Sequence, residues 1–156
     1  MPSTDLPAEE AFVAFFAGAE PTLRRALIAA YGPTGREAAA DALAYGWEHW
    51  ERVGSMHDPI GYLYRVGQSR MRWYRRRPRA VAPPDPAPEP HLDPGLDTAL
   101  AKLTRPQRVA VVLCHGFGLT HREVAALLGV APSTVQNHVE RGIAKLRSRL
   151  EVSEDA

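Results

Sequence analysis

Arginine and aromatic residues are interleaved in one short stretch of the sequence, which reads RVGQSRMRWYRRRPR from residue 65 to residue 79. Residues 59–79 contain seven arginines and no acidic residue. Guanidinium groups contact phosphates and aromatic rings stack on unpaired bases, so this combination is typical of single-stranded nucleic-acid binding. The alternative is an ordinary solvated helix face, and the stretch alone does not decide between the two.

A helical wheel separates this stretch into two sides. The predicted core side carries Ile60, Leu63, Gly67, Met71 and Tyr74. The opposite side carries the candidate DNA-contacting residues Arg65, Ser69, Arg72 and Arg76, flanked by Tyr62 and Trp73. In the competing interpretation, the rings of Tyr62 and Trp73 are buried instead.

A second motif lies in the sequence LTHREVAALLGVAPSTVQNHVERGIAKLRSRL, residues 119–150. The pairs Thr120 with Glu123 and Ser133 with Gln136 have the spacing of two capping boxes, each of which marks a helix start. Gly129 stands where the first of these helices must end in a left-handed turn. Two helix starts with such a tight connection predict a helix-turn-helix.

The second helix of this motif has a predicted outer face for DNA. Val135, Val139, Ile143 and Leu146 are expected to face inward. The outward residues near its start are expected to meet base edges in the major groove: Ser133, Thr134, Asn137 and Arg141. Lys145 continues the positive charge toward phosphates, together with Arg147 and Arg149.

The elements that must position these motifs are helices in two blocks. Proline is so dense in PRAVAPPDPAPEPHLDPG, residues 78–95, that we expect an extended linker there. It separates residues 1–77, a predicted bundle of three or four helices, from residues 96–151, which hold the helix-turn-helix. In the first block, one helix is expected over 38–53 and another from Pro59 onward. The sequence therefore predicts an all-α fold of two small helical domains joined by a Pro-rich linker.

Several functional classes receive no support from the sequence. The six histidines are scattered without metal-ligand spacing, and there is no glycine-rich phosphate loop or nucleophile–base set. We therefore expect no metal, no cofactor and no catalytic residue, and we interpret Cys114 as a buried thiol. No apolar run approaches the ~20 residues of a membrane span, and the acidic N-terminus lacks the features of a signal peptide. With a single cysteine, these features predict a cytoplasmic protein without membrane insertion.

Taken together, the two blocks resemble RNA polymerase sigma factors of the small extracytoplasmic-function group in their minimal two-domain form. Residues 100–147, with Leu103, Gln107 and Arg108 as an L-x-x-x-Q-R pattern, are similar to the family's C-terminal promoter-reading domain. REAAADALAYGWEHWERV is similar to the helix that grips the polymerase clamp, and DPIGYLYRVGQSRMRWYRRR resembles the helix that opens the −10 element. The resemblance implies that core RNA polymerase, through its clamp and flap, and promoter DNA are the partners. It leaves the existence of an anti-sigma factor open.

The resemblance also assigns surfaces. Glu37 and Asp41 would face the polymerase clamp, the basic helix would face the melted −10 element, and the helix-turn-helix would read the −35 element. The sequence departs from the family pattern at Ser69 and Trp73, where asparagine and aspartate are common. A rival interpretation is a stand-alone helix-turn-helix regulator that binds duplex DNA without polymerase. That rival leaves the charge segregation unexplained, with −5 over residues 1–58 and +7 over residues 59–79.

Overall fold

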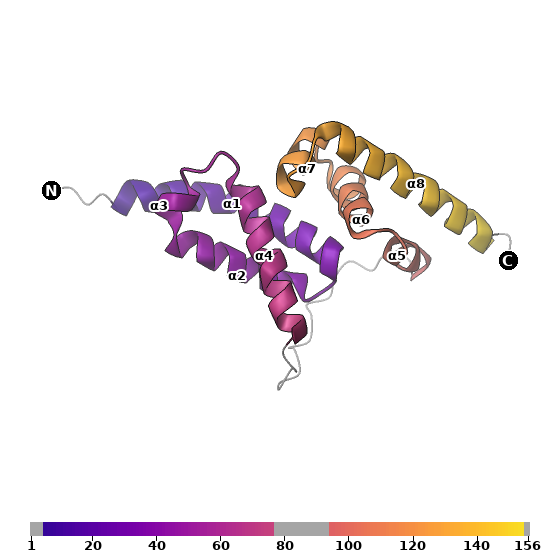
Figure 1. Ribbon diagram of the computed structural model, residues 1–156, viewed down its shortest axis with the longest axis horizontal. Coiled ribbons are helices and arrows are strands. Elements are labelled where there is room, and N and C mark those ends of the chain that lie inside the picture. The colour runs from indigo at the N-terminus through magenta and orange to yellow at the C-terminus, as the bar shows by residue number, and fades with distance from the viewer. Residues whose placement is uncertain (1–4, 77–93, 155–156) are drawn as a thin grey trace. The chain divides into compact units, whose positions relative to one another are not determined.

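The computed structural model describes residues 5–76 and 94–154 (Figure 1). The chain divides into two compact units, Met1–Pro78 and Arg79–Ala156. The described residues form helices and turns without any strand, which confirms the predicted all-α fold. None of the helices within these two ranges combines the length and hydropathy that a membrane span requires.

The first unit is a small bundle whose elements are α1 (Asp5–Tyr31), α2 (Gly35–Glu48), α3 (Trp50–Val53) and α4 (Pro59–Arg76). Gly32 takes a positive φ of 85° at the turn between α1 and α2, a conformation that favours glycine. Pro59 opens α4 as predicted, and the Asp58 carboxylate accepts a hydrogen bond from the Gly61 amide at 3.1 Å. The turn residues therefore fix where α2 and α4 begin.

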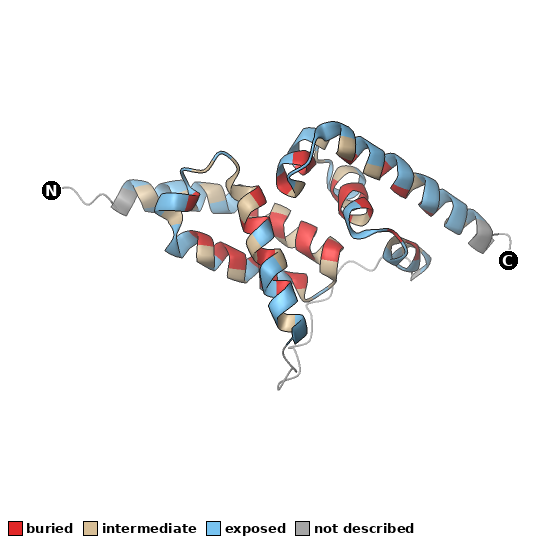
Figure 2. Ribbon diagram, viewed as in Figure 1, coloured by how far each residue is buried: buried red, intermediate tan, exposed pale blue. Residues whose placement is uncertain are grey.

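The core of this unit lies where α1, α2 and α4 pack together. In Figure 2 buried residues concentrate in the C-terminal half of α1 and in α2, whereas the N-terminal half of α1 is largely exposed. Near that exposed end, Phe12 packs against Trp47 and Trp50 with ring centroids 5.0 and 5.4 Å apart. The helix predicted over 38–53 is interrupted at His49, whose φ of −118° and ψ of 30° separate α2 from α3.

The second unit contains α5 (Pro94–Ala101), α6 (Arg105–Val111), the π-helix η1 (Val112–Gly116), α7 (His121–Leu128) and α8 (Pro132–Glu154). Helix α8 contacts α5, α6 and α7. Gly142 lets α8 cross close to α6, since a Cβ there would lie 2.6 Å from Cγ2 of Val111. The largest fully buried side chains of this unit are Val109, Leu113, Val124, Leu127 and Val135.

The predicted linker needs one correction. Helix α5 starts at Pro94, so residues 94 and 95, which we assigned to the linker, are helical. Proline is well suited to a first helical turn, because its missing N–H would have no partner there. Residues 78–93 of the predicted linker lie outside the described residues.

Candidate nucleic-acid interface

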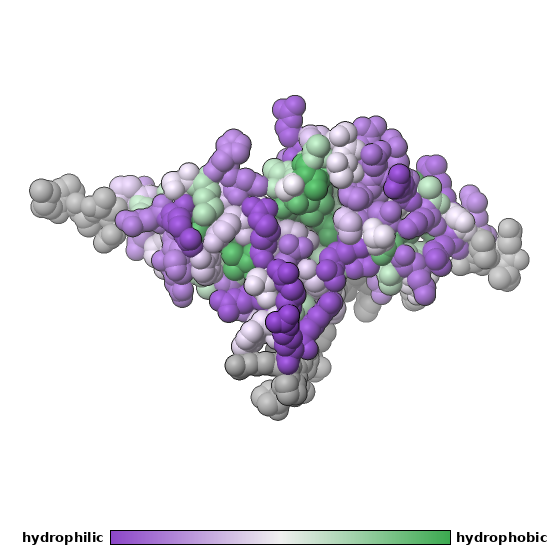
Figure 3. Space-filling model, in the orientation of Figure 1, coloured by the Kyte–Doolittle hydropathy of each residue, from purple (hydrophilic) through white to green (hydrophobic). Residues whose placement is uncertain are grey.

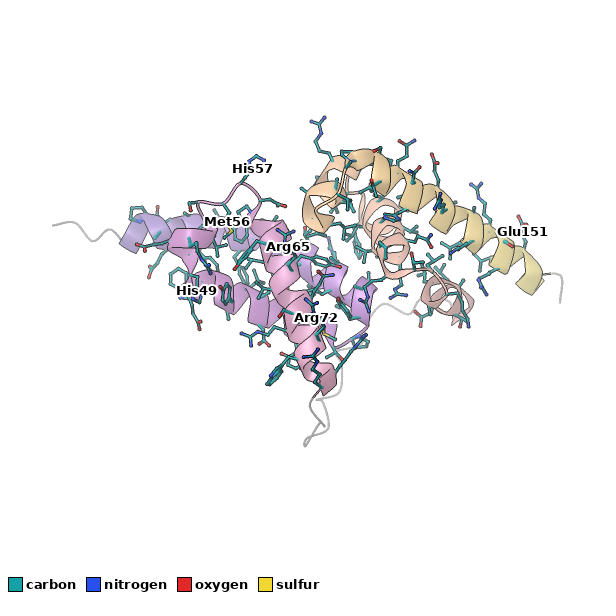
Figure 4. All side chains as sticks on the ribbon, in the orientation of Figure 1. His49, Met56, His57, Arg65, Arg72 and Glu151 are labelled. Carbon is teal, nitrogen blue, oxygen red and sulfur yellow. The ribbon has the colours of Figure 1, made fainter. Side chains whose placement is uncertain are left out.

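The outer face of α4 presents the cations that the sequence places there. Arg65, Ser69, Arg72 and Arg76 are all exposed, and the buried side of the helix holds Leu63, Tyr64, Gly67 and Met71. In Figure 3 hydrophilic residues follow α4 along its length, and Figure 4 labels Arg65 and Arg72 on it. Trp73 is 46% exposed, which contradicts the competing interpretation that its ring is buried, and Tyr62 is half-buried.

Helix α4 is fixed to the bundle by contacts on its other side. The Tyr74 hydroxyl donates a hydrogen bond to the Asp41 carboxylate of α2. Burial and this bond raise the pKa of Tyr74 from 10.0 to about 12, so the hydroxyl remains a hydrogen-bond donor even above pH 10.0. The Arg75 guanidinium lies 5.5 Å from the centre of the Tyr31 ring on α1. The basic residues of α4 thus include one that anchors the helix.

The two acidic residues proposed for polymerase binding have different surroundings. Glu37 is exposed in the first turn of α2. Asp41, one turn later, is half-buried and already accepts the hydrogen bond from Tyr74. Asp41 therefore has a structural partner, 33 positions away in the chain, that the sequence did not indicate.

Sequence reasoning missed a polar aromatic cluster beside α4, formed by Tyr45, His49, Arg52 and Tyr62. The Tyr45 and Tyr62 hydroxyls are 3.3 Å apart, and Arg52 Nη2 donates to both of them. The His49 ring stacks on Tyr45, with centroids 4.1 Å apart and planes inclined by 24°. The hydrogen bond between the hydroxyls, with the Arg52 charge beside it, lowers the pKa of Tyr45, and the same bond raises the pKa of Tyr62.

The helix-turn-helix forms with the predicted turn. The Thr120 hydroxyl accepts from the Glu123 amide at 3.1 Å, and the Glu123 carboxylate accepts from the Thr120 amide at 3.3 Å, which confirms the first capping box. Gly129 ends α7 with a φ of 70° and a ψ of 36°, the predicted left-handed conformation. Helix α8 follows after a short connection.

The second predicted capping box is wrong. Helix α8 begins at Pro132, so Ser133 already lies inside the helix. The Ala131 carbonyl accepts the first hydrogen bonds, from Thr134 at 3.0 Å among others. The Gln136 amide donates to the Glu140 carboxylate at 3.1 Å instead of reaching back to the helix start. Proline is favoured at the first position of a helix, because its fixed φ suits the helix and its missing N–H needs no partner there. This preference places the start of α8 at Pro132, one residue before Ser133.

The residues predicted to lie on the outer face of α8 are otherwise accessible to solvent, as expected. Ser133, Asn137 and Arg141 are exposed and Thr134 is half-buried. Lys145 is exposed too, but its Nζ donates to Oε1 of Gln107 on α6 at 3.2 Å. Gln107 is 7% exposed and forms a capping box with Thr104, which the sequence analysis did not identify. Lys145 therefore bridges α8 to the start of α6.

Other candidate chemistry is sparse in the described residues. Cys114 is half-buried on η1, where burial raises the pKa of its thiol. Within residues 5–76 and 94–154, no group of three histidine, cysteine or acidic side chains is arranged to hold a metal ion. The described residues present an arginine-rich helix face in one unit and a helix-turn-helix in the other.

Comparison with known proteins gives consistent matches. The family described as Sigma-70, region 4 matches residues 95–146. The RNA polymerase sigma-E factor of Streptomyces coelicolor is 34% identical over 119 residues, covering 70% of this chain and 67% of that protein. The sigma-E factor of Streptomyces antibioticus is 33% identical over 120 residues, with the same coverage of 70% and 67%. The ECF RNA polymerase sigma factor SigE of Mycolicibacterium smegmatis is 34% identical over 110 residues, covering 67% of this chain and 42% of that protein.

A solved structure has a similar fold. The sigma factor RpoE of Bartonella quintana, crystallised with the anti-sigma factor NepR, matches with a TM-score of 0.63. The match covers 90% of this chain and 97% of that one at 22% sequence identity. At this identity the likeness describes the fold.

Proposed function

Because the chain belongs to the RNA polymerase sigma factors of the extracytoplasmic-function type, we propose that it binds core RNA polymerase and directs it to particular promoters. The observation that carries this proposal is the region 4 helix-turn-helix, whose outer face on α8 is exposed for DNA. The exposed arginine face of α4 supplies a second, chemically different DNA surface. A stand-alone regulator that binds duplex DNA would leave that second surface without a role.

Each unit has its own part in this proposal. The α4 face binds the melted −10 element through Tyr62, Arg65, Ser69, Arg72, Trp73 and Arg76. The α8 face reads the −35 element through Ser133, Thr134, Asn137 and Arg141, while Lys145 supports the contact by holding α8 against α6. Arginines on α4 supply attraction to phosphates, whereas the short polar side chains on α8 suit hydrogen bonds to base edges. When the polymerase holds both units, their separate contacts act together through effective concentration.

The protein partners follow from the family. We assign polymerase-clamp binding to the surface around Glu37 and Asp41, and a contact with the polymerase flap to the second unit. An anti-sigma factor is a further proposed partner, because the structural neighbour was crystallised with one. In this role the chain works in the cytoplasm and needs no cofactor, since the polymerase performs the chemistry.

A run-off transcription assay tests the proposal. Core RNA polymerase is incubated with fragmented genomic DNA, with and without the purified protein. Discrete transcripts that require the protein are the expected result. No such transcripts, together with no co-purification of core polymerase, would favour a duplex-binding regulator and overturn the proposal.

A further inference from the structure

Helices α1 and α2 border an apolar groove that lies outside the proposed DNA surfaces. The two helices pack side by side in the first unit (Figure 1), and the groove has a volume of about 500 Å³. Phe12 contacts Trp47 at one end of the helix pair, whereas the backbone of Leu27 lies against Gly35 at the other end, so the helices run antiparallel. The groove therefore extends along both helices.

Large apolar side chains are exposed beside this groove. Val13 on α1 is 65% exposed and Phe16 is 41% exposed, and Trp47, which lines the groove with Phe16, is 45% exposed. Ala40 and Ala44 line the α2 side and are also exposed, so no long side chain there keeps a partner helix away. Apolar side chains gathered in this way mark a surface that another protein covers.

The charges on this side of α1 differ between its two ends. A series of residues at three- or four-residue spacing lies on one side of the helix: Glu9, Val13, Phe16, Glu20 and Arg24. Glu9 is exposed, with Glu10 beside it. At the other end Arg24 pairs with Glu20 at 3.2 Å, and Arg36 of α2 adds a positive charge to the same end of the groove. The surface is therefore acidic at one end, apolar in the middle and basic at the other end.

A surface with this order of charges is complementary to a second copy of itself. Glu9 and Arg24 lie on either side of Phe16 and at similar distances from it along the helix. When two α1 helices lie antiparallel and cross near Phe16, Glu9 of each copy reaches the basic end of the other, and the apolar side chains meet in the middle. Most symmetric dimers form through a patch that contacts its own copy. We propose that two copies of this chain pair through the α1–α2 groove in this antiparallel arrangement.

Pairing of this kind covers a part of α2 that the proposed function requires. Arg36 lines the groove, and Glu37, which we assign to clamp binding, follows it directly on α2. A second copy in the groove therefore competes with core polymerase. This consequence rests on the proposed function, although the pairing itself does not. Because dimerisation depends on protein concentration, the chain restrains its own activity when it accumulates.

Sedimentation equilibrium of the full-length protein tests the pairing. The average mass should rise from 17.1 kDa toward twice that value as the concentration increases from about 1 µM to about 1 mM, the range of weak dimers. Val13→Glu should weaken the dimer at least about tenfold, because it removes an apolar contact at two symmetric positions and places a negative charge near Glu20 of the second copy. Glutamate is a better helix former than valine, so α1 should remain folded.

A matched control and a charge exchange make the test specific. Val130→Glu makes the same change at a 38% exposed position in the second unit and should leave the dimer affinity unchanged. Glu9→Arg and Arg24→Glu should each weaken the dimer, whereas the double variant, which has the native net charge, should regain affinity because the two charges have exchanged places. Circular dichroism establishes that each variant is folded.

The outcomes distinguish a second copy from other occupants of the groove. The mass of a single chain at every concentration would overturn the proposal, and so would a dimer that Val13→Glu leaves intact. If the native protein stays monomeric and Val13→Glu loses core polymerase, the groove belongs to the polymerase and not to a second copy. Dimers that respond to Val13→Glu, without protein-dependent transcripts in the run-off assay, would support the pairing and overturn only the proposed function.

Discussion

The DNA face of α4 predicts a specific change in salt dependence. The double variant Arg65→Gln/Arg72→Gln removes two exposed cations from the outer side of the helix (Figure 4). Each phosphate contact contributes about 0.7 to the slope of log affinity against log salt on a single strand, so the slope should fall by about 1.4. Across a fourfold change in salt, the affinity gap between native and variant protein should change by about sevenfold. The measurement is a titration of labelled single-stranded DNA between about 50 and 200 mM salt, the range in which such effects are large.

The same helix offers a control with an identical change in net charge. The double variant Arg70→Gln/Arg75→Gln also removes two exposed cations, but Arg75 packs over the Tyr31 ring and Arg70 interacts with Tyr74, away from the side of the helix that carries Arg65 and Arg72. Its slope should stay close to that of the native protein, although its thermal stability should fall through the loss of the Arg75 contact. Equal slope changes in the two double variants would refute the assignment of a DNA face and leave only a general charge effect.

Three further predictions concern recognition, packing and pH. Asn137→Ala on α8 should change which duplex sequences are bound, by ~1–3 kcal/mol for a lost base contact, in competition binding; a uniform loss on all sequences would indicate a phosphate contact instead. Gly35→Ala should destabilise the first unit by about 1–3 kcal/mol in urea unfolding, because its Cβ would lie 2.3 Å from backbone atoms of Leu27. As a control, Gly18→Ala has open space around the added Cβ and should stabilise the unit by ~0.5–1 kcal/mol. The pKa of Tyr74 is raised from 10.0 to about 12, so the stability that its neutral form provides is complete below pH 10.0 and is lost as the pH rises through about 12. When the free energy of unfolding is measured against pH, Tyr74→Phe should lack this loss of stability at alkaline pH. An equal loss of stability in the native protein and in Tyr74→Phe would contradict the prediction.

Local signals in the sequence were sufficient for the helix-turn-helix. The first capping box needs only Thr120 and Glu123, and the turn needs only a glycine at position 129, so both are determined within a few residues. The outer face of α4 was also predictable, because the period of a helix separates Leu63 and Met71 from Arg65 and Arg72. These features depend on neighbours in the sequence.

Features that depend on distant partners were not predictable. Tyr74 meets Asp41 across 33 positions and Lys145 meets Gln107 across 38, and neither pair has a spacing that indicates contact. The aromatic cluster likewise depends on the break at His49, which sequence periodicity did not reveal. Such contacts arise from how the helices pack.

The packing also explains why the arginines of α4 differ in function although they share a helix. Arg75 is held over the Tyr31 ring on α1, and Tyr74 beside it is tied to Asp41 on α2, so the C-terminal end of α4 is attached at two points to the bundle. These attachments hold Arg72 on the exposed side, and binding a strand there does not require the helix itself to become ordered. Ordering a chain segment on association costs free energy. Because Arg75 already anchors α4 to the bundle, the outward arginines of α4 should bind DNA more tightly than the same arginines on an unanchored basic segment would. On this argument, loosening the anchor through Tyr74→Phe should weaken single-strand affinity while leaving the salt slope unchanged, because every outward cation remains.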